Sequence, residues 1–453
     1  MMIIRRYFLL LIVLTFAAVV SAATDVDSLV ATFQQVRIPR LRASVGPLPS
    51  PKTDALPTLQ VLIDGLARNG GGRLIVKPGT YMLRGSLVMK SGVELHLEEG
   101  ALLLFSGEAD DFLPVVKTRW EGTDLMGRSA MIYANGAENI AITGSGTIDA
   151  QGHIEMARWG LTADTEDFKE NAHGTHGETI EMPDVRRLRA LGDVEGSERV
   201  FGKGTHLRPC AVEFYRCSRV LVEGITLRNS PFWCIHPVYC DNVTVRGVTI
   251  DSHSPNNDGC DPESSRNVLI ENCLFRTGDD AVAIKGGKGT WADTDPDNGP
   301  CFNILIQHCK YGVVHSCLTL GSESVHDRNI LLRNIEVNGA DRVLWLKMRP
   351  DTPQHYEYVT ADNITGATGS FLVVRPWTQF FQPGNRDDMP LSQCNHITIS
   401  HINMECRNFF DVGTSDKYSL RNFTFRHINV KDEKKAFDPQ VIENSMVDDV
   451  MVQ

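Results

Sequence analysis

A short strand motif repeats along the sequence at intervals that match one coil of a β-solenoid. The motif, Asn-Val/Ile-x-Val/Ile or a close variant, begins at nine anchor positions: Ile140, Val220, Val243, Val268, Ile304, Ile330, Val359, Ile397 and Phe423. After the first gap, successive anchors are 23, 25, 36, 26, 29, 38 and 26 residues apart. Repeats of about 20 to 45 residues stack on their neighbours and need no second core. The spacing therefore predicts an all-β chain folded as a parallel β-helix with loops of varying length.

Asparagine precedes six of the nine anchors. These residues are Asn139, Asn242, Asn267, Asn303, Asn329 and Asn422. Asparagine tolerates the left-handed backbone of a tight turn, and its amide can bond to the equivalent amide one coil away. We therefore interpret the Asn-x-Thr sequences at Asn242, Asn363 and Asn422 as turns rather than as glycan sites.

The cysteines follow the same register. Four of them lie three residues before an anchor and two lie five residues after one: Cys217, Cys240, Cys301 and Cys394, then Cys273 and Cys309. Buried apolar ladders explain this pattern most simply, although a disulfide between Cys217 and Cys240 stays an open alternative. None of the eleven cysteines has metal-finger spacing, so we expect no zinc site.

The first 22 residues have the order of a secretory signal peptide. Arg5 and Arg6 precede an apolar run, and small residues follow it. The run is shorter than the roughly 20 residues that span a bilayer, so no membrane anchor is expected. We predict an exported protein, periplasmic or extracellular. Residues 23–52 show no period and are predicted to be a lead-in segment.

Residues 53–453 are predicted to form the β-helix domain. Between Thr53 and Asn69, apolar residues recur at helical spacing, so this segment should be an amphipathic helix that caps the open end of the core. The charged stretch 151–208 is predicted to be a long loop insertion, and loops of this length are often functional.

The net charge of the chain limits the classes of molecule that it is expected to bind. Without Arg5 and Arg6, the chain has 43 basic and 56 acidic residues, a net charge of about −13. A negative surface argues against nucleic acid or an anionic membrane as a partner. An anionic substrate would therefore need a local basic pocket. We expect the protein to act as a monomer.

Three carboxylates stand in two polar clusters within the stretch Pro255–Gly287. Asp258 follows Asn256 and Asn257, and 21 residues later Asp279 and Asp280 form a pair. Because 21 residues are about one coil, we expect Asp258 and Asp279 to lie one above the other, about 4.8 Å apart along the stacking axis.

Other polar and aromatic residues fall at similar offsets from their own anchors, which predicts that they share one groove with the carboxylates. They are His315, Lys347, Arg349, Trp233 and His236. Each carboxylate alone would be read as a turn or capping residue. Gathered on one face they favour acid-assisted cleavage of a glycosidic bond, because crowded carboxylates raise one another's pKa and one can stay protonated.

The chain resembles the polygalacturonase family, glycoside hydrolase family 28, over roughly residues 70–430. The motifs occur in the family's order, and two of them look like the exo-acting bacterial branch. They are Asn229-Ser-Pro-Phe-Trp-Cys-Ile-His-Pro-Val-Tyr-Cys240, Pro255-Asn-Asn-Asp-Gly-Cys-Asp-Pro-Glu-Ser264, Asp279-Asp280 and His315 with Gly321-Ser-Glu323. The resemblance implies a right-handed parallel β-helix and an exo-acting hydrolase of galacturonosyl linkages in pectic chains. It also implies a single, inverting displacement that uses no metal or other cofactor.

The resemblance implies a role for each site residue. Asp279 would be the general acid, Asp258 and Asp280 would position and deprotonate water, and His315 would hold the acid's protonation. The expected substrate-binding residues are Asn256, Lys347, Trp345, Arg349, Trp233, His236 and Lys285.

Two positions depart from the family's pattern. Ser316 replaces the glycine after the histidine, and Trp345-Leu-Lys347 replaces Arg-x-Lys, so the arginine that grips the substrate carboxylate is missing. Arg349 or Arg375 could replace it. Three alternatives stay open: a rhamnogalacturonan-type hydrolase, a calcium-dependent eliminase like the pectate lyases, and a carbohydrate-binding solenoid without catalytic activity.

Overall fold

The computed structural model describes residues 26–50, 52–156, 195–378 and 386–453. The chain divides into two units, Met1–Thr32 and Phe33–Gln453. In the first unit, the described part is helix α2 (Val26–Thr32). The predicted signal peptide lies outside the described residues and stays a prediction. Among the helices that the structure describes, none is long and apolar enough to cross a membrane.

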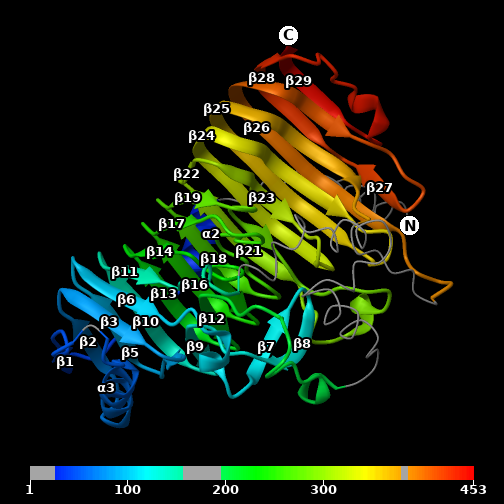
Figure 1. Ribbon diagram of the computed structural model, residues 1–453. Helices are drawn as coiled ribbons and strands as arrows, with labels where there is room; N and C mark the ends of the chain where they lie inside the picture. The colour runs from blue at the N-terminus through cyan, green and yellow to red at the C-terminus, as the bar shows by residue number, and fades with distance from the viewer. Residues whose placement is uncertain (1–25, 51, 157–194, 379–385) are drawn as a thin grey trace, which may run out of the picture. The chain divides into compact units, whose positions relative to one another are not determined.

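The second unit is a right-handed parallel β-helix, in which each strand pairs with the equivalent strand of the next coil (Figure 1). The first column of strands runs the length of the unit. It contains β1 (Arg42–Val45), β2 (Gly72–Val76), β5 (Val93–Leu97), β10 (Glu138–Gly144), β13 (Ser218–Glu223), β16 (Asp241–Arg246), β18 (Arg266–Glu271), β21 (Cys301–Gln307), β24 (His326–Met348), β25 (His355–Pro376), β26 (Ser392–Val412), β27 (Tyr418–Arg421), β28 (Thr424–Asp432) and β29 (Met446–Val452).

Two further columns complete the coils. The second contains β3 (Gly79–Leu83), β6 (Ala101–Phe105), β11 (Thr147–Asp149), β14 (Thr226–Arg228), β17 (Thr249–Ser252), β19 (Leu274–Thr277) and β22 (Lys310–Tyr311). The third contains β4 (Leu87–Val88), β9 (Ile132–Asn135), β12 (Val212–Tyr215) and β15 (Ile235–Val238), and it continues through single bridges to β20 (Ala283–Ile284) and β23 (Val314–Leu320). β24, β25 and β26 are single long strands, each of which spans more than one face of the solenoid.

The strand register confirms the predicted repeat. Val220 pairs with Ile140 on one side and Val243 on the other, and the pairing continues from anchor to anchor as far as Ile397. All nine anchor side chains are at most 1% exposed. They form an apolar column through the centre of the solenoid, so each coil buries its anchor between two others.

The turn before each anchor has a left-handed backbone. All six predicted asparagines have φ between 53° and 61°. The residues before the other three anchors, Arg219, Tyr358 and His396, adopt the same conformation without being asparagine. The predicted amide ladder is present, since Asn303 donates to Asn267 at 3.0 Å and Asn329 donates to Asn303 at 2.6 Å.

The capping helix forms as predicted. Helix α3 (Leu56–Arg68) begins with Pro57 in its first turn, and the Asp54 carboxylate accepts a hydrogen bond from the Leu56 amide at 3.0 Å. Leu59, Ile63 and Leu66 are buried and belong to the core of the solenoid. The helix therefore covers apolar groups that the first coil would otherwise expose to water.

The structure differs from the sequence-based expectation in two places near the N-terminal half. The predicted lead-in contains β1, which pairs in parallel with β2 and adds a coil edge. An antiparallel hairpin, β7 (Val116–Trp120) and β8 (Thr123–Gly127), projects from the coils. The expected insertion 151–208 is described only at its ends, with a 3-10 turn at Gly196–Glu198.

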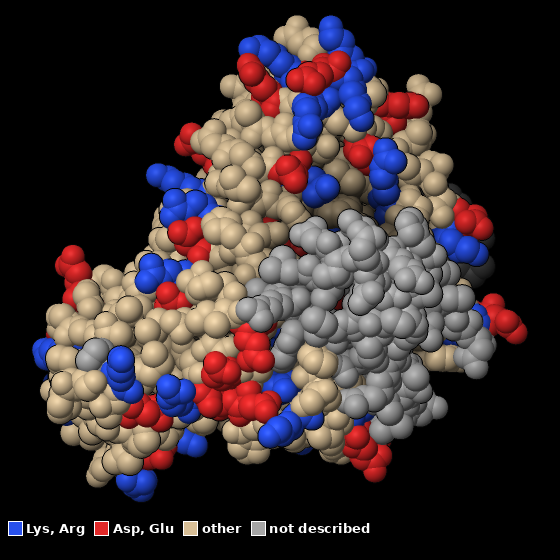
Figure 2. Space-filling view, viewed as in Figure 1, with Lys and Arg blue, Asp and Glu red and all other residues tan. Residues whose placement is uncertain are grey.

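Other details concern turns, thiols and the surface. Further 3-10 turns lie at Ala109–Phe112, Ala292–Thr294 and Pro439–Val441. All eleven cysteines are buried free thiols, as a ladder of apolar residues predicts, and the Cys217–Cys240 disulfide is not formed. Figure 2 shows acidic and basic side chains interspersed on the visible face.

We predict that Ile63→Ala lowers the free energy of unfolding by about 2–5 kcal/mol, because it leaves a cavity between α3 and the core. Urea denaturation followed by circular dichroism measures the change. Val61→Ala on the same helix is the matched control, since Val61 is 65% exposed. Equal losses in the two variants would contradict the capping role of α3.

Candidate active site

The third column of strands places the predicted carboxylates on adjacent coils. The Gly259 amide donates to the Asp280 carbonyl at 2.9 Å, and the bridge from Cys260 to Val282 sets the register of these coils. Asp258 is therefore in register with Asp280. The expectation that Asp258 lies above Asp279 is wrong by one residue. Asp279 instead lies beside His315, whose amide donates to the Asp279 carbonyl at 3.0 Å.

The buried side chain of Asn257 holds the turn that carries Asp258. Its amide nitrogen donates to the carbonyls of Ser230 and Phe232, both at 2.9 Å, and its oxygen accepts from the Ser254 amide at 2.8 Å. These bonds satisfy backbone groups of two coils at once, so they fix where Asp258 emerges.

Arg208 fixes the same region from the end of the long insertion. Its guanidinium donates to the carbonyls of Pro231 and Pro255 at 3.0 and 2.7 Å and to the Asn256 side chain at 2.7 Å. Sequence analysis did not single out Arg208 or assign a role to Asn257. A buried arginine, 2% exposed, that bonds to two loop carbonyls is a positioning group.

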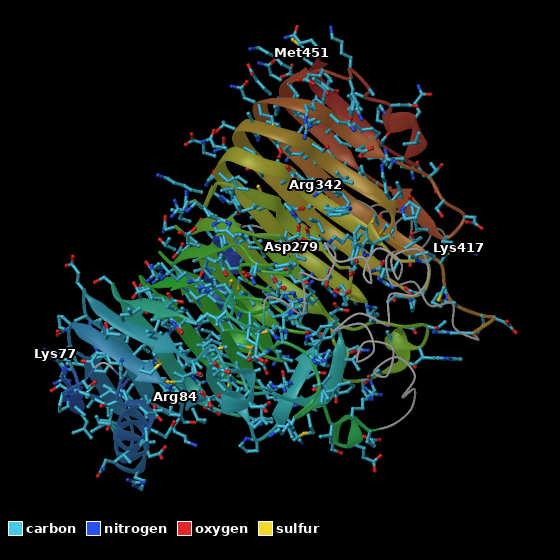
Figure 3. The ribbon with its side chains drawn as sticks, in the orientation of Figure 1. Lys77, Arg84, Asp279, Arg342, Lys417 and Met451 are labelled. Carbon is cyan, nitrogen blue, oxygen red and sulfur yellow. The ribbon has the colours of Figure 1, made fainter. Side chains whose placement is uncertain are left out.

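These elements surround a cavity of about 430 Å³. Figure 3 labels Asp279 and Arg342 near the middle of the solenoid, where the cavity lies. The cavity is lined by Glu121, Phe232, Trp233, Asn256, Asp258, Asp279, Lys285, His315, Ser322, Glu323, Asp341, Arg342, Trp345, Lys347 and Trp377. The structure thus brings together eight of the residues predicted from sequence, while Asp280 contacts the cavity wall through Lys347.

Three predicted cations do not line the cavity. His236 is fully buried behind Trp233, where its Nε2 lies 2.9 Å from a Glu263 oxygen. Arg349 is 2% exposed, and it donates from Nε and Nη2 to Asp351 at 2.7 and 2.6 Å. Arg375 is an exposed partner of Asp411. Similar offsets placed His236 and Arg349 in the predicted groove, but their side chains point to other partners.

The three aspartates are crowded. Asp258, Asp279 and Asp280 each offer an oxygen that lies within 4.8 Å of the other two. Burial and the nearby Asp279 carboxylate together raise the pKa of Asp258 to about 7, although the charge of Lys285 opposes the shift. Asp258 therefore titrates near neutral pH.

The pKa of Asp279 is shifted in the opposite direction. Burial raises its pKa, but the hydrogen bond with His315 and the charges of Lys347 and His315 outweigh burial and lower it. The same hydrogen bond, 3.1 Å between His315 Nδ1 and Asp279 Oδ1, raises the pKa of His315. The histidine and the carboxyl group therefore hold one proton between them and titrate as a pair.

Two lysines neutralise the other carboxylates. Lys347 Nζ lies 3.1 Å from an Asp280 oxygen, and Lys285 Nζ lies 3.6 Å from Asp258 and 3.4 Å from Glu323. Calcium or magnesium would prefer the oxygen atoms of the three aspartates. Two ammonium groups already contact these oxygens, so the donor set does not fit a divalent cation.

Aromatic rings and a guanidinium form the opposite wall. The Trp345 and Trp377 rings meet edge to face at 5.0 Å, and Lys347 Nζ lies 4.4 Å from the Trp345 centroid. The Arg342 guanidinium stacks 4.2 Å from the same ring. Arg342 falls 12 residues after Ile330, as Asp280 does after Val268. The anchor register could therefore have identified it from sequence.

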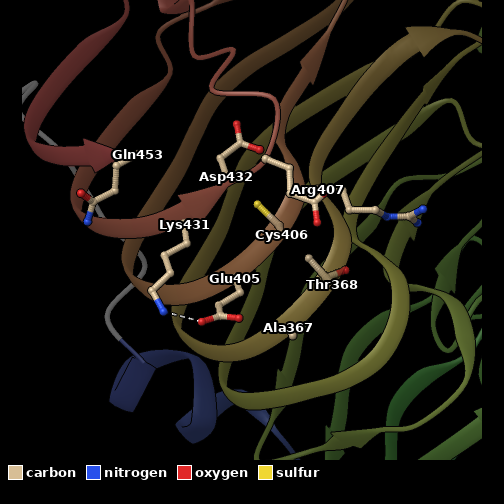
Figure 4. Close-up of a pocket in the computed structure, with 9 residues that line it drawn as sticks. Ala367, Thr368, Glu405, Cys406, Arg407, Lys431, Asp432 and Gln453 are labelled. Carbon is tan, nitrogen blue, oxygen red and sulfur yellow. Dashed lines mark hydrogen bonds and ion pairs between the residues drawn. The ribbon is translucent and has the colours of Figure 1, made fainter.

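A second cavity, of about 390 Å³, lies at the C-terminal coils (Figure 4). Its charged groups pair with each other at exposed positions, as Lys431 does with Glu405 at 2.6 Å. Exposed ion pairs of this kind contribute little to stability, and they do not strongly change the reactivity of the groups around them. The carboxylate cavity is the better candidate for catalysis.

The chain is similar to known proteins over the region that contains the cavity. The family model of glycosyl hydrolases family 28 matches residues 161–365, a range that includes the cavity aspartates Asp258, Asp279 and Asp341. The chain is 32% identical to a probable polygalacturonase of Vitis vinifera over 226 residues, covering 48% of this chain and 38% of the relative. It is 26% identical to an endo-polygalacturonase of Pectobacterium carotovorum subsp. carotovorum over 324 residues, 68% of each chain.

A solved structure is similar over most of the chain. It is a hyperthermoactive exopolygalacturonase from Thermotoga maritima, which is 29% identical, with a TM-score of 0.79 over 90% of this chain and 91% of the other. The alignment with the grapevine relative spans about two fifths of that protein's length. In its motifs, its fold and these comparisons, the chain is similar to glycosyl hydrolases family 28, a family of glycoside hydrolases.

Proposed function

We propose that the protein is an exported, exo-acting hydrolase of galacturonosyl linkages in pectic chains. The observation that carries the proposal is the cluster of three aspartates beside His315, whose Nδ1 lies 3.1 Å from an Asp279 oxygen and whose pKa is raised by that hydrogen bond. Crowded carboxyl groups with a proton held next to them can supply both the acid and the base that cleave a glycosidic bond. The signal-like N-terminus supports export, and the cavity lysines and Arg342 suit an acidic sugar.

In the proposed reaction, the proton held by the His315–Asp279 pair passes from Asp279 to the leaving glycosidic oxygen. The bond between that oxygen and the anomeric carbon breaks. Water attacks the same carbon, and its proton goes to the carboxylates of Asp258 and Asp280. Lys347, 3.1 Å from Asp280, orients that carboxylate while it binds the substrate.

We propose a single displacement with inversion at the anomeric carbon. Oxygens of the three aspartates lie within 4.8 Å of one another, closer than the roughly 6.5–9.5 Å that usually separates the two carboxyl groups of an inverting enzyme. With only two carboxyl groups, so short a separation would favour retention of configuration. A third carboxylate changes this argument, because Asp258 and Asp280 can hold a water between them beside the acid. Proton NMR of the first product distinguishes the two outcomes.

We predict that Asp279→Asn lowers kcat on galacturonan oligomers by at least about 100-fold, because the amide keeps the shape and cannot supply the proton. New reducing ends measure the rate, and circular dichroism checks the fold. Asp341→Asn, also on the cavity wall, is the matched control. Activity of Asp279→Asn within a few-fold of the parent would remove Asp279 from the acid role.

The eliminase alternative has a distinct signature in the same assay. An eliminase would form an unsaturated product that absorbs in the ultraviolet, and a chelator would abolish that product. The lysine contacts in the cluster favour hydrolysis, since a calcium ion would have to displace them. Substrate binding without any product would support the non-catalytic alternative.

The β7–β8 hairpin supports exo action. Glu121 at its tip lines the cavity, and its carboxylate lies 3.4 Å from Lys288 Nζ on the opposite loop. Gly122, with φ of +77°, packs so closely that a Cβ would lie 3.0 Å from the Glu323 Cβ and 3.1 Å from the Gly287 carbonyl carbon. In the proposed function, the tip packed at this edge of the cavity blocks passage of a longer chain, so that the substrate enters by its own end.

We predict that Gly122→Ala pushes the hairpin tip away and adds internal cleavage of long galacturonan. The measurement is the fall in viscosity per bond cleaved, which is larger for internal cleavage. Gly136→Ala is the matched control, because Gly136 also has positive φ (+64°) but has open space around its Cβ position. An unchanged ratio in Gly122→Ala would contradict the proposed role of the hairpin.

Arg342 is our candidate for the missing carboxylate-binding arginine. Its Nη1 donates to the His315 carbonyl at 3.3 Å, and stacking on Trp345 aims the guanidinium plane along the cavity. A guanidinium fork binds a carboxylate through two parallel hydrogen bonds, which an ammonium cannot do. This arrangement supports galacturonate as the bound sugar over a neutral residue of rhamnogalacturonan.

We predict that Arg342→Lys lowers kcat/KM on homogalacturonan oligomers by about tenfold, or about 1.4 kcal/mol of transition-state binding. The ratio of kcat/KM on homogalacturonan oligomers to kcat/KM on rhamnogalacturonan oligomers should fall as well. Arg375→Lys, outside the cavity, is the control. If Arg342→Lys leaves the ratio unchanged, Arg342 does not bind the substrate carboxylate, and Trp345→Arg then tests whether the family's own position can.

A further inference from the structure

A fourth aspartate lies directly behind the catalytic cluster. Asp261 is three residues after Asp258, on the chain segment that continues the third column, and it is fully buried. It does not line the cavity. The reaction proposed above does not use it, although a buried carboxyl group is costly unless it is paired or protonated.

The surroundings of Asp261 indicate that a proton is shared between its carboxyl group and that of Asp258. Neither of its oxygens has a hydrogen-bond donor among the described residues. Its side chain is nonetheless within hydrogen-bond reach of Asp258. Two ionised carboxylates cannot form a hydrogen bond, so the contact exists only when one of them carries a proton.

The charged groups around Asp258 and Asp261 are compatible with one proton shared between the two carboxyl groups. Lys285 Nζ lies 3.6 Å from Asp258 and 3.9 Å from Asp261, so one ammonium faces both carboxyl groups. Asp280 also faces Asp261 and raises its pKa, as Asp258 does, on top of the effect of burial. The thiols of Cys210, Cys234 and Cys260 are nearby, and burial raises the pKa of each, which keeps them neutral.

We propose that Asp258 and Asp261 share one proton, and that Asp261 is a positioning residue that keeps Asp258 able to accept a proton from water. The inference rests on the proposed hydrolase function and deepens it. Asp261 holds the proton and donates a hydrogen bond to one Asp258 oxygen. The other Asp258 oxygen stays free to accept from the attacking water.

The step balances without any other reactant. Water gives its proton to Asp258 as its oxygen bonds to the anomeric carbon, and Asp279 gives a proton to the leaving oxygen. After product release, the extra proton leaves Asp258 to solvent, and the His315–Asp279 pair takes one up. The proton on Asp261 is not consumed.

Two substitutions separate this role from a structural one. Asp261→Asn keeps a donor toward Asp258 and removes no charge beside it, because Asp261 is already protonated in the proposed state. The acid limb of the kcat/KM profile should therefore keep its position, with activity at the optimum kept within about tenfold. Asp261→Ala removes the donor, and its activity should fall at least about tenfold below that of Asp261→Asn.

Asp327→Asn is the matched control. Asp327 is also fully buried, has one oxygen with no partner among the described residues, and has a pKa raised to about 7 by burial. It accepts from Ser324 Oγ at 2.6 Å rather than from the cluster. Its substitution should change thermal stability without moving the acid limb.

A measurement on the free protein tests the shared proton without substrate. Infrared difference spectra of the parent and Asp261→Asn should show the C=O stretch of a protonated carboxyl in the parent alone at neutral pH. Absence of that band, or an acid limb that moves to lower pH in Asp261→Asn, would overturn the proposal. Equal activity of Asp261→Ala and Asp261→Asn would also overturn it. Failure of the parent to hydrolyse any pectic oligomer would instead overturn the proposed function, because the infrared result does not depend on it.

Discussion

The backbone hydrogen bonds between coils are the constraint on which the site depends. They hold equivalent residues of neighbouring coils one strand spacing apart, whatever their side chains prefer. On the third column this register places Asp258 over Asp280, and the next position places Asp279 beside His315. The anchor side chains, buried in a continuous column, provide the stability that keeps like charges together.

The crowding of charge is what makes the cluster chemically useful. A single aspartate on a surface would ionise below neutral pH and could serve only as a base. Here burial and a neighbouring carboxylate raise the pKa of Asp258, whereas His315 and Lys347 lower that of Asp279. Lys285 and Lys347 contact the cluster closely enough to offset part of this repulsion.

The loops that leave the coils determine how substrate reaches this cluster. The hairpin tip at Gly122 packs against Gly287 and Glu323, and the wall formed by Trp345 and Arg342 faces the carboxylates. The coil supplies a fixed row of reactive groups, and the loops decide which part of a chain can lie against it. The same division explains why a parallel β-helix can serve different saccharides.

Much of the fold could be predicted because periodicity is a local property of the sequence. The anchors, the asparagine turns and the capping helix follow from short-range patterns, and the structure contains all three. The offset argument also brought Asp258, Asp279, His315 and Lys347 to one cavity. It failed for His236 and Arg349, because an offset gives the coil position of a residue and not the direction of its side chain.

The sequence by itself determined the coil length, the buried column and the set of residues available for acid–base chemistry. Tertiary structure alone decided which carboxylates meet, since a shift of one residue exchanges Asp279 for Asp280 opposite Asp258. It also decided that Arg342 reaches the cavity while Arg349 pairs with Asp351. Loop lengths and burial set these contacts, and both depend on the packing of coils that are distant in sequence.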